Sequence, residues 1–515
     1  MRATGKRFQI SELDKAVFKG TVLWGILAFG YMLTNKITSN DDLGSLYSTG
    51  GGIYNGRWMT GLYGQIFHAI NSPWNNGIIF LIIAALTSVL ILRMLQIKNR
   101  MCALLIGATF ITFPSNISLL FYDFTVVPYA LGIFLSVLAA LLISKRKSIW
   151  SIQGGCICIV LSLAFYQAYF CLTASLLILV LIKEIRDISA TSTIKYAMLD
   201  IAILAEGMAI YLMVQSLLVR ISSVSTSYQN KHSIGEVHIS DIPEQIVSAY
   251  NIFVKYNQRM FPFSVAGKIV DVCTIIITVL FLFIFMRNMI VEHTKLKIVL
   301  LVIASILLPI ACNLVYMYGA EEVHSLMLYG NVCRPILCIL LVDMLVDDSK
   351  FNIKFEIQKV MSCVVCIMIL CMNINNAVLA NHEYSKQEHL VNATTQYLNV
   401  LITQIKSLEG YNSDMKVAFV GLCNDPAIDE IDSCYLKSSL VGSNNMWQLI
   451  NTPLHWGWCQ TEFFRVYMGY TAEFVTSDEE RQVIADNPIV QNMPNYPNAG
   501  SIGIVDDVIV VHLSN

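Results

Sequence analysis

The sequence predicts an all-α polytopic membrane bundle of about eleven transmembrane helices, followed by a small α/β domain at the C-terminal end. Three observations lead to this prediction. Only 14% of the 515 residues are charged and 55% are hydrophobic, whereas a soluble domain carries about 25% charged residues. Apolar runs of spanning length recur up to about residue 377, and each could cross a bilayer as a helix. Beyond them the composition becomes polar and acidic.

The apolar runs give the expected spans in chain order. The first follows a basic start and lacks a cleavage site of small residues, so we expect a retained helix rather than a signal peptide. The expected spans are 17–35, 74–92, 101–117, 125–143, 149–165, 168–184, 197–219, 265–286, 297–316, 330–346 and 358–377.

Lysine and arginine give the expected orientation. If the N-terminus is cytoplasmic, the cytoplasmic loops hold 20 of the 34 basic residues and the opposite loops hold 8. An excess of Lys and Arg is typical of cytoplasmic loops. An odd number of spans then puts the C-terminus outside. We therefore expect a multi-pass protein with a cytoplasmic N-terminus and an extracytoplasmic C-terminus.

Long polar loops occur on the outer side only, at 36–73, 220–264 and 317–329. Because functional residues concentrate in loops, a protein with long loops on one face is expected to work on that face. In the first loop, apolar side chains from Trp58 to Ile70 recur every three or four residues. This pattern fits either a helix lying in the membrane interface or a short helix packed over the bundle.

The sequence divides into a predicted membrane domain at 1–378 and an extracytoplasmic domain at 379–515. In the second domain, residues 384–408 have helical periodicity, 416–421 resemble a buried strand, and 502–513 resemble two strands around an Asp-Asp turn. The region from Asn381 onward holds 16 acidic and 6 basic residues. Such a charge is poorly suited to nucleic acid or to an anionic lipid surface.

Most of the 14 cysteines lie in or beside apolar runs, where a thiol behaves as a small hydrophobe. Cys363 and Cys366 form a C-x-x-C inside an expected span, without a second pair or a histidine cluster. We therefore assign them no metal or redox role. Cys423, Cys434 and Cys459 lie in the polar region and could form one disulfide.

Two adjacent carboxylates, Asp41 and Asp42, follow the first expected span where it leaves the bilayer. They could be a solvated helix end, a general base or metal ligands. Partial dehydration near the interface makes a carboxylate a better base near neutral pH. Arg57 follows about fifteen residues later and would supply a guanidinium fork for a phosphate, with Trp58 beside it.

Tyr166, Gln167 and Tyr169 lie between the fifth and sixth expected spans. Their aromatic rings could form an ordinary interfacial belt. Alternatively, rings, hydroxyls and an amide could form a platform for a sugar, and we expect Trp58 to contact the sugar or the acceptor as well. Gln167 is costly to bury in lipid, which favours a cavity.

Charged residues at other outer ends are further candidates. Arg334 opens the tenth expected span, where it could hold a phosphate or extend its charged end to the interface. Lys255 and Arg259 are weaker candidates for the same phosphate. Glu321 and Glu322 could contact a sugar or the acceptor.

Four short motifs, in order along the chain, resemble the bacterial Gtr-type glucosyltransferases, which include the serotype-converting enzymes that modify O-antigen. The motifs are Asn-Asp-Asp-Leu-Gly at 40–44, Gly-Arg-Trp at 56–58, Tyr-Gln-Ala-Tyr-Phe at 166–170, and 493–501 with the strands that follow. The resemblance covers nearly the whole chain. It implies a GT-C glycosyltransferase of the bacterial inner or plasma membrane, moving a sugar, glucose in this family, from a polyprenyl phosphate to a glycan hydroxyl. In such enzymes an acidic residue of the first outer loop is catalytic, which here is Asp41 or Asp42.

On this basis we expect direct displacement, with Arg57 and Arg334 balancing the charge of the leaving phosphate. No cofactor is expected to be obligatory, and a divalent metal, if used, would bind Asp41 and Asp42. The expected partners are a polyprenyl-phosphate sugar, a lipid-linked or surface polysaccharide, and membrane lipid, without nucleic acid. Two alternatives stay open. A lipid-linked glycan transporter or flippase would have repeats and ionisable or broken helices at the midplane, and a polysaccharide ligase or polymerase would not need the aspartate pair.

Overall fold

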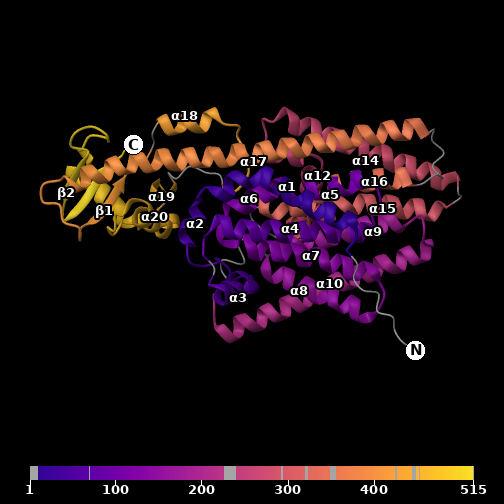
Figure 1. Cartoon of the computed structure of the whole chain (residues 1–515). Helices are drawn as coiled ribbons and strands as arrows, with labels where there is room; N and C mark the ends of the chain where they lie inside the picture. The colour runs from indigo at the N-terminus through magenta and orange to yellow at the C-terminus, as the bar shows by residue number, and fades with distance from the viewer. Residues whose placement is uncertain are drawn as a thin grey trace. The chain divides into compact units, whose positions relative to one another are not determined.

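A computed structural model gives two compact units, which are described one at a time (Figure 1). The bundle unit comprises Met1–Thr34, Tyr47–Ala380 and Ser438–Leu440, and the sheet unit comprises Asn35–Leu46, Asn381–Lys437 and Val441–Asn515. The structure describes residues 10–68, 70–225, 239–291, 294–318, 323–347, 355–423, 426–442, 448–451 and 453–513.

Within the described residues, all the regular secondary structure of the bundle unit is helical. Its elements are α1 (Glu12–Thr34), η1 (Ile53–Asn55), α3 (Trp58–Phe67), α4 (Pro73–Leu95), α5 (Arg100–Ile111), α6 (Pro114–Phe121), η2 (Asp123–Thr125), α7 (Val126–Lys145), α8 (Ile149–Phe165), η3 (Gln167–Tyr169), α9 (Phe170–Glu184), α10 (Ala190–Ser222), η4 (Ile239–Asp241), α12 (Ile242–Val254), α13 (Tyr256–Met260), α14 (Val265–Val291), α15 (Lys295–Cys312), η5 (Leu314–Tyr318), η6 (Ser325–Val332), α16 (Cys333–Asp347) and the first part of α17 (Phe355–Lys406).

The predicted all-α membrane bundle is confirmed. Ten helical segments among the described residues are long and apolar enough to cross a membrane. The expected span at 149–165 is α8, a shorter apolar helix of 17 residues, which extends about 26 Å at 1.5 Å per residue. One segment, Arg100–Phe121, is broken into α5 and α6 at Pro114, because proline lacks an N–H and disfavours helical geometry in the residue before it.

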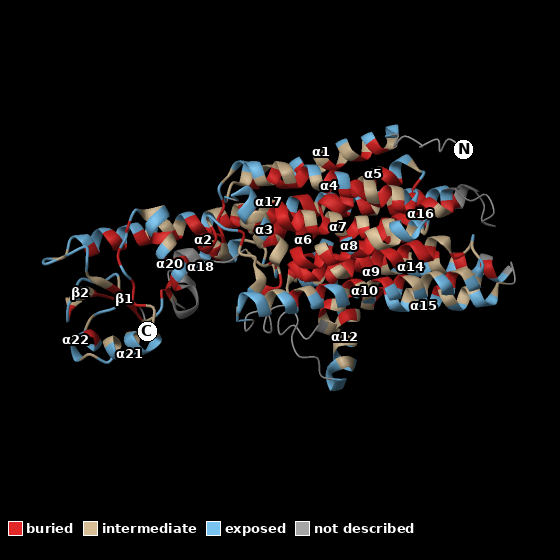
Figure 2. Ribbon diagram, turned by 90° about the horizontal axis from the view of Figure 1, so that it is seen from below, coloured by how far each residue is buried: buried red, intermediate tan, exposed pale blue. Residues whose placement is uncertain are grey.

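The helices of the bundle differ strongly in burial (Figure 2). In the most apolar stretch of each spanning segment, 94% of the residues of Arg100–Phe121 and 100% of those of Ser325–Val346 are buried, but only 22% of those of Ala190–Ser222. The side chains that α10 and α14 expose are mainly apolar, for example Leu217 and Ile276. A protein surface of this composition is suited to lipid rather than water.

The sheet unit consists of a small sheet and several helices. Strands β1 (Lys416–Val420), β2 (Ile502–Val505) and β3 (Val508–His512) lie in the order β1-β3-β2. β1 and β3 are parallel, with Lys416 paired with Val508, and β2 and β3 form an antiparallel hairpin. The helices are α2 (Asn40–Gly44), the second part of α17, α18 (Pro426–Cys434), α19 (Gln448–Asn451), α20 (Pro453–Met468), α21 (Asp478–Ala485) and α22 (Pro488–Gln491).

The predicted strands and the turn between the last two are confirmed. Asp506 and Asp507 have φ values of 50° and 60°, as a two-residue hairpin turn of the favoured hand requires. The helical prediction needs one correction. Two separate helices were expected at 358–377 and 384–408, but α17 runs without a break from Phe355 to Lys406.

The segment Asn35–Leu46 belongs to the sheet unit, although it lies between the first two expected spans. Leu43 is part of a buried cluster that includes Leu390 of α17, Val417 of β1 and Ile509 of β3. The sequence interpretation had placed this segment in the first domain. In the structure it packs with residues more than 340 positions further along the chain.

Candidate functional site

Helix α2 is a short turn that carries both predicted catalytic carboxylates. Ser39 is its N-cap, and the Ser39 hydroxyl accepts a hydrogen bond from the Asp42 N–H at 3.4 Å. Asp41 and Asp42 occupy the first turn, where the helix dipole favours negative charge. At its other end, a Cβ on Gly44 would lie 3.0 Å from Cys459 Sγ and 3.3 Å from the Trp458 ring. The absence of a side chain at Gly44 therefore lets α2 pack directly on α20.

Asp41 lies toward α20. It precedes Gly44 by three residues, so the two lie on the same side of the helix. Burial, together with the nearby Asp41 carboxylate, raises the pKa of the Cys459 thiol to about 11. Asp41 itself is only partly buried. It is therefore a carboxylate on an accessible edge of α2.

Asp42 has different surroundings, because adjacent helical residues point about 100° apart. Its side chain is fully buried and lies near Tyr467 of α20. Burial raises the pKa of Tyr467, a hydrogen bond with Thr38 lowers it, and the Asp42 carboxylate raises it further. The two adjacent aspartates thus have different neighbours and different access to water.

Helix α17 supports the start of α2 with residues that the sequence interpretation missed. Gln387 is fully buried, and its Nε2 donates a hydrogen bond to the Thr38 carbonyl at 3.1 Å. Glu383 lies one turn earlier, is also fully buried, and has an Oε1 3.6 Å from His382 Nδ1. The available signal was the dense polar run His382–His389 directly after the last expected span.

The predicted phosphate ligand Arg57 lies in the bundle unit, immediately before α3. The backbone reaches it through Gly56 in the left-handed region, with φ of 73°. Arg57 Nη1 donates a hydrogen bond to the Tyr129 hydroxyl at 2.9 Å, and its guanidinium lies 4.7 Å from the centre of the Tyr166 ring. Tyr166 stacks on Tyr129 with ring centres 4.6 Å apart. An aromatic pair therefore holds the guanidinium in place.

Tyr166, Gln167 and Tyr169 are all buried in the structure. Gln167 Nε2 donates to the Asn55 carbonyl at 3.0 Å and to the Tyr211 hydroxyl at 2.9 Å, and Tyr211 donates to the Gly56 carbonyl. These contacts fix the loop that presents Arg57. The interpretation of the three residues as a sugar platform stays a prediction, since in this conformation they support the loop.

Trp58 begins α3 and is partly buried. Thr60 is the one buried residue of this helix, and Leu62, Ile66 and Phe67 are exposed. A short helix packed over a bundle would turn such side chains inward. Their outward orientation instead fits the alternative of a helix lying in the membrane interface.

Arg334 is buried and forms an ion pair with Asp271 in this conformation. It is 3% exposed, and its Nη2 lies 2.9 Å from Asp271 Oδ1. The Asp271 carboxylate also accepts hydrogen bonds from the N–H groups of Asn257 and Gln258 in α13. The charge of Arg334 is therefore balanced inside the protein.

Two other predicted ligands, Lys255 and Arg259, lie in the region of α12 and α13. Lys255 and Arg259 are exposed, one at the junction of α12 and α13 and the other within α13. Glu321 and Glu322 lie outside the described residues.

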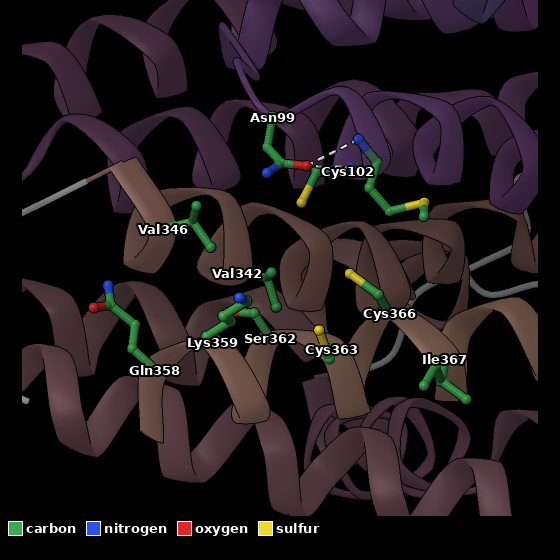
Figure 3. A pocket seen from close by; sticks show the side chains of 11 residues that line it. Asn99, Cys102, Val342, Val346, Gln358, Lys359, Ser362, Cys363, Cys366 and Ile367 are labelled. Carbon is green, nitrogen blue, oxygen red and sulfur yellow. Dashed lines mark hydrogen bonds between the residues drawn. The ribbon is translucent and has the colours of Figure 1, made fainter. Parts of the chain in front are cut away.

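A cavity of about 440 Å³ lies between α5, α16 and α17 (Figure 3). Cys102 and Cys366 point into it, and Cys363, Gln358 and Lys359 also line it. Its lining, as far as the structure describes it, contains no carboxylate. Within the described ranges, no group of three or more His, Cys, Asp or Glu side chains is arranged to hold a metal ion.

Comparison with known families decides the class of the protein. The family described as Glucosyl transferase GtrII matches residues 30–334, which is more than half of the chain. The chain belongs to the GtrII glucosyl transferase family. The match begins before α2 and ends at Arg334, and so includes Asp41, Asp42, Arg57 and Tyr166–Tyr169. No curated protein and no solved structure matches the chain. Membership of GtrII makes this chain a membrane glycosyltransferase that uses a sugar donor and a glycan acceptor.

Proposed function

We propose that this GtrII protein is a GT-C-type enzyme that moves glucose from a polyprenyl-phosphate donor to a hydroxyl of a cell-surface polysaccharide such as O-antigen. The reaction takes place at the outer face of the bacterial inner membrane. Three features support the proposal: the glucosyl transferase family, the apolar bundle suited to a lipid-borne donor, and the excess of basic residues in alternate loops.

The observation that carries the mechanism is the unequal burial of Asp41 and Asp42. A general base must come within hydrogen-bond reach of the acceptor hydroxyl. Asp41 is partly exposed on the edge of α2, whereas Asp42 is enclosed beside Tyr467. We therefore assign Asp41 as the base and Asp42 as the residue that orients the α2 turn.

The proposed reaction is a single displacement. The Asp41 carboxylate takes the proton of the acceptor hydroxyl while the hydroxyl oxygen forms a bond to the anomeric carbon. The bond from that carbon to the phosphate oxygen breaks, and polyprenyl phosphate leaves with the electron pair. Attack from the side opposite the leaving group inverts the configuration at the anomeric carbon.

Arg57 is assigned to the donor phosphate. Its guanidinium is pre-oriented by Tyr129 and Tyr166, and it stands at the N-terminus of α3, where free N–H groups and the helix dipole favour an anion. A fixed cation stabilises the charge that develops as the phosphate leaves. The exposed Lys255 and Arg259 are further cations available for this role.

A metal is not required by this scheme, because a phosphate ester already leaves well. If a divalent ion takes part, the carboxylates Asp41 and Asp42 would bind it, although they have different neighbours in this conformation. Incubation with a chelator is expected to leave transfer unchanged. Loss of transfer, restored by a divalent ion, would contradict this.

The first prediction concerns the base. We expect Asp41→Asn to lower kcat by about 10²- to 10⁴-fold, because it removes the group that accepts the proton. Asp42→Asn should lower kcat less, since it disturbs only orientation. Asp414 is an exposed aspartate of the same unit, so Asp414→Asn is the matched control and should have the kcat of the wild type. The assay uses purified protein, polyprenyl-phosphate glucose and a glycan acceptor.

The outcomes distinguish the assignments. An active Asp41→Asn with an inactive Asp42→Asn would exchange the two roles. Normal transfer by both variants would refute a catalytic role for the pair. Transfer from a nucleotide-linked glucose in place of the polyprenyl donor would refute the proposed donor.

A further inference from the structure

Trp458 is a large apolar side chain in an unusual environment. It is 67% exposed, although other faces of α20 are deeply buried through Phe463 and Phe464. Tryptophan is normally buried over most of its surface, because its ring gains a large hydrophobic free energy when covered. Packing within the sheet unit therefore covers only part of the Trp458 ring.

Its position relates it to the proposed base. A Cβ on Gly44 would lie 3.3 Å from both Cε3 and Cζ3 of the Trp458 ring, so the six-membered edge of the indole borders α2. Asp41 lies on that same side of α2 and affects the adjacent Cys459. An exposed aromatic ring and a partly exposed carboxylate thus lie along one short contact between α2 and α20.

This combination matches the chemistry of a sugar. A pyranose ring has an apolar C–H face that stacks on an aromatic ring, and its hydroxyls donate to carboxylates. The charge of the surrounding region restricts the class of ligand further. The chain from Asn381 onward has 16 acidic and 6 basic residues, so a neutral sugar ring is favoured over a phosphate group or an anionic lipid surface as the ligand of Trp458 itself.

We propose that Trp458 is the stacking platform of the acceptor subsite and binds a neutral sugar unit of the acceptor glycan beside Asp41. The inference rests on the proposed function in one respect, that the chain glucosylates a glycan. It adds the place where that glycan binds and the side chain that binds it.

The test measures glycan binding separately from transfer. A soluble fragment of the acceptor polysaccharide is titrated without donor into the full-length wild-type protein and into the variants Trp458→Ala, Trp458→Phe and Asp41→Asn. We expect Trp458→Ala to raise the Kd by about 3- to 10-fold, the range of one aromatic stacking contact. Trp458→Phe should keep most of the affinity, and Asp41→Asn should still bind.

Trp150→Ala is the control for a generally exposed tryptophan, since Trp150 is 83% exposed at the start of α8. In transfer assays, Trp458→Ala should raise the KM for the acceptor and leave the KM for the donor unchanged. Unchanged glycan affinity in Trp458→Ala would overturn the proposal. A raised KM for the donor in Trp458→Ala would assign Trp458 to the donor site and would also overturn the proposal. A loss of membrane-inserted protein in both Trp458→Ala and Trp150→Ala would assign Trp458 to the membrane interface, with the same consequence.

Two further results keep this test separate from the proposed function. If Trp458→Ala fails to fold, saturation-transfer NMR on the wild-type protein replaces the titration of that variant. Absence of magnetisation transfer from the indole to the glycan would then refute the stacking platform. If glycan binding depends on Trp458 while Asp41→Asn transfers normally, the acceptor subsite stands and the base assignment fails.

Discussion

At the scale of single residues, two neighbouring acids have different surroundings because one helical step separates them. Asp41 faces the Cys459 edge of α20 and Asp42 is enclosed beside Tyr467. Removing an ionised carboxylate from water costs several kcal/mol of folding free energy unless surrounding groups compensate for the lost hydration. Asp42 is therefore expected to hold the geometry of the turn, and Asp41 to exchange protons with a substrate.

The second prediction uses Cys459 as a reporter of the Asp41 charge. The pKa of its thiol is about 11, through burial first and the Asp41 carboxylate second. A negative neighbour disfavours the thiolate, so Asp41→Asn should lower this pKa and raise the reactive thiolate fraction at pH 8–9. The measurement is the rate of iodoacetamide modification at Cys459, followed by mass spectrometry. Equal rates in Asp41→Asn and in the control Asp414→Asn would contradict the proximity of the two side chains.

The third prediction concerns Arg57. Arg57→Ala should lower kcat/KM for the polyprenyl donor by about 10- to 100-fold, the range expected for a charge-assisted phosphate contact of 1.5–3 kcal/mol. Arg57→Lys should have a kcat/KM for the donor between those of the wild type and Arg57→Ala. An ammonium keeps the charge but loses the planar contact with the Tyr166 ring. The KM for the acceptor should not change. A donor KM equal to that of the wild type in both variants would exclude Arg57 from the phosphate site.

At the scale of elements, the site depends on the close approach of α2 and α20. The fourth prediction is that Gly44→Ala destabilises the sheet unit. A better helix propensity gains about 0.5–1 kcal/mol, but overpacking against Cys459 and Trp458 costs about 1–3 kcal/mol. The net effect should be a lower midpoint of thermal unfolding.

Two variants control this comparison. A Cβ on Gly503 in β2 would meet only Met493 Cε at 3.8 Å, so Gly503→Ala should be tolerated. Cys459→Ala removes the nearest sulfur and should partly restore Gly44→Ala. A Gly44→Ala protein as stable as the wild type would show that the two helices can separate without cost.

Some elements could be predicted from the sequence because their signal is local. The strands around Asp506 and Asp507 follow from a short apolar alternation and a turn dipeptide, and the spans follow from length and hydropathy. The continuity of α17 was missed because a polar run after an apolar one looks like a boundary. The run Asn376–Ser385 contains no glycine or proline to end a helix, which was the usable signal.

The site was only partly predictable for a related reason. Asp41, Asp42 and Arg57 were found as charged residues in the loop that the basic residues predict to be the first outer one. The burial of Tyr166 and Gln167, the ion pair of Arg334 with Asp271, and the support from Gln387 all depend on contacts between distant segments. Such contacts leave no periodic pattern in a single sequence.

At the scale of the whole molecule, orientation is the property that the proposed function needs most. The fifth prediction is that the C-terminus lies outside the cytoplasm. Alkaline phosphatase fused after Asn515 should be active, and a green fluorescent protein fused there should be dark. The same fusions within the expected cytoplasmic loop at 144–148 are the controls and should behave in the opposite way. The reverse pattern would place the candidate carboxylates in the cytoplasm and refute an outer-face reaction.

The sheet unit combines one early segment of the chain with two late ones, which the ribosome makes at very different times. Asn35–Leu46 emerges after the first span, whereas its packing partners in α17, β1 and β3 are synthesised last. At typical synthesis rates of about 5–20 residues per second, the segment waits for roughly 20 to 90 seconds before those partners exist. During that interval α2 lacks its core contacts, and a chain cut short lacks Cys459 and Trp458. The turn that holds Asp41 can therefore form its core contacts with β3 only after that strand has been synthesised.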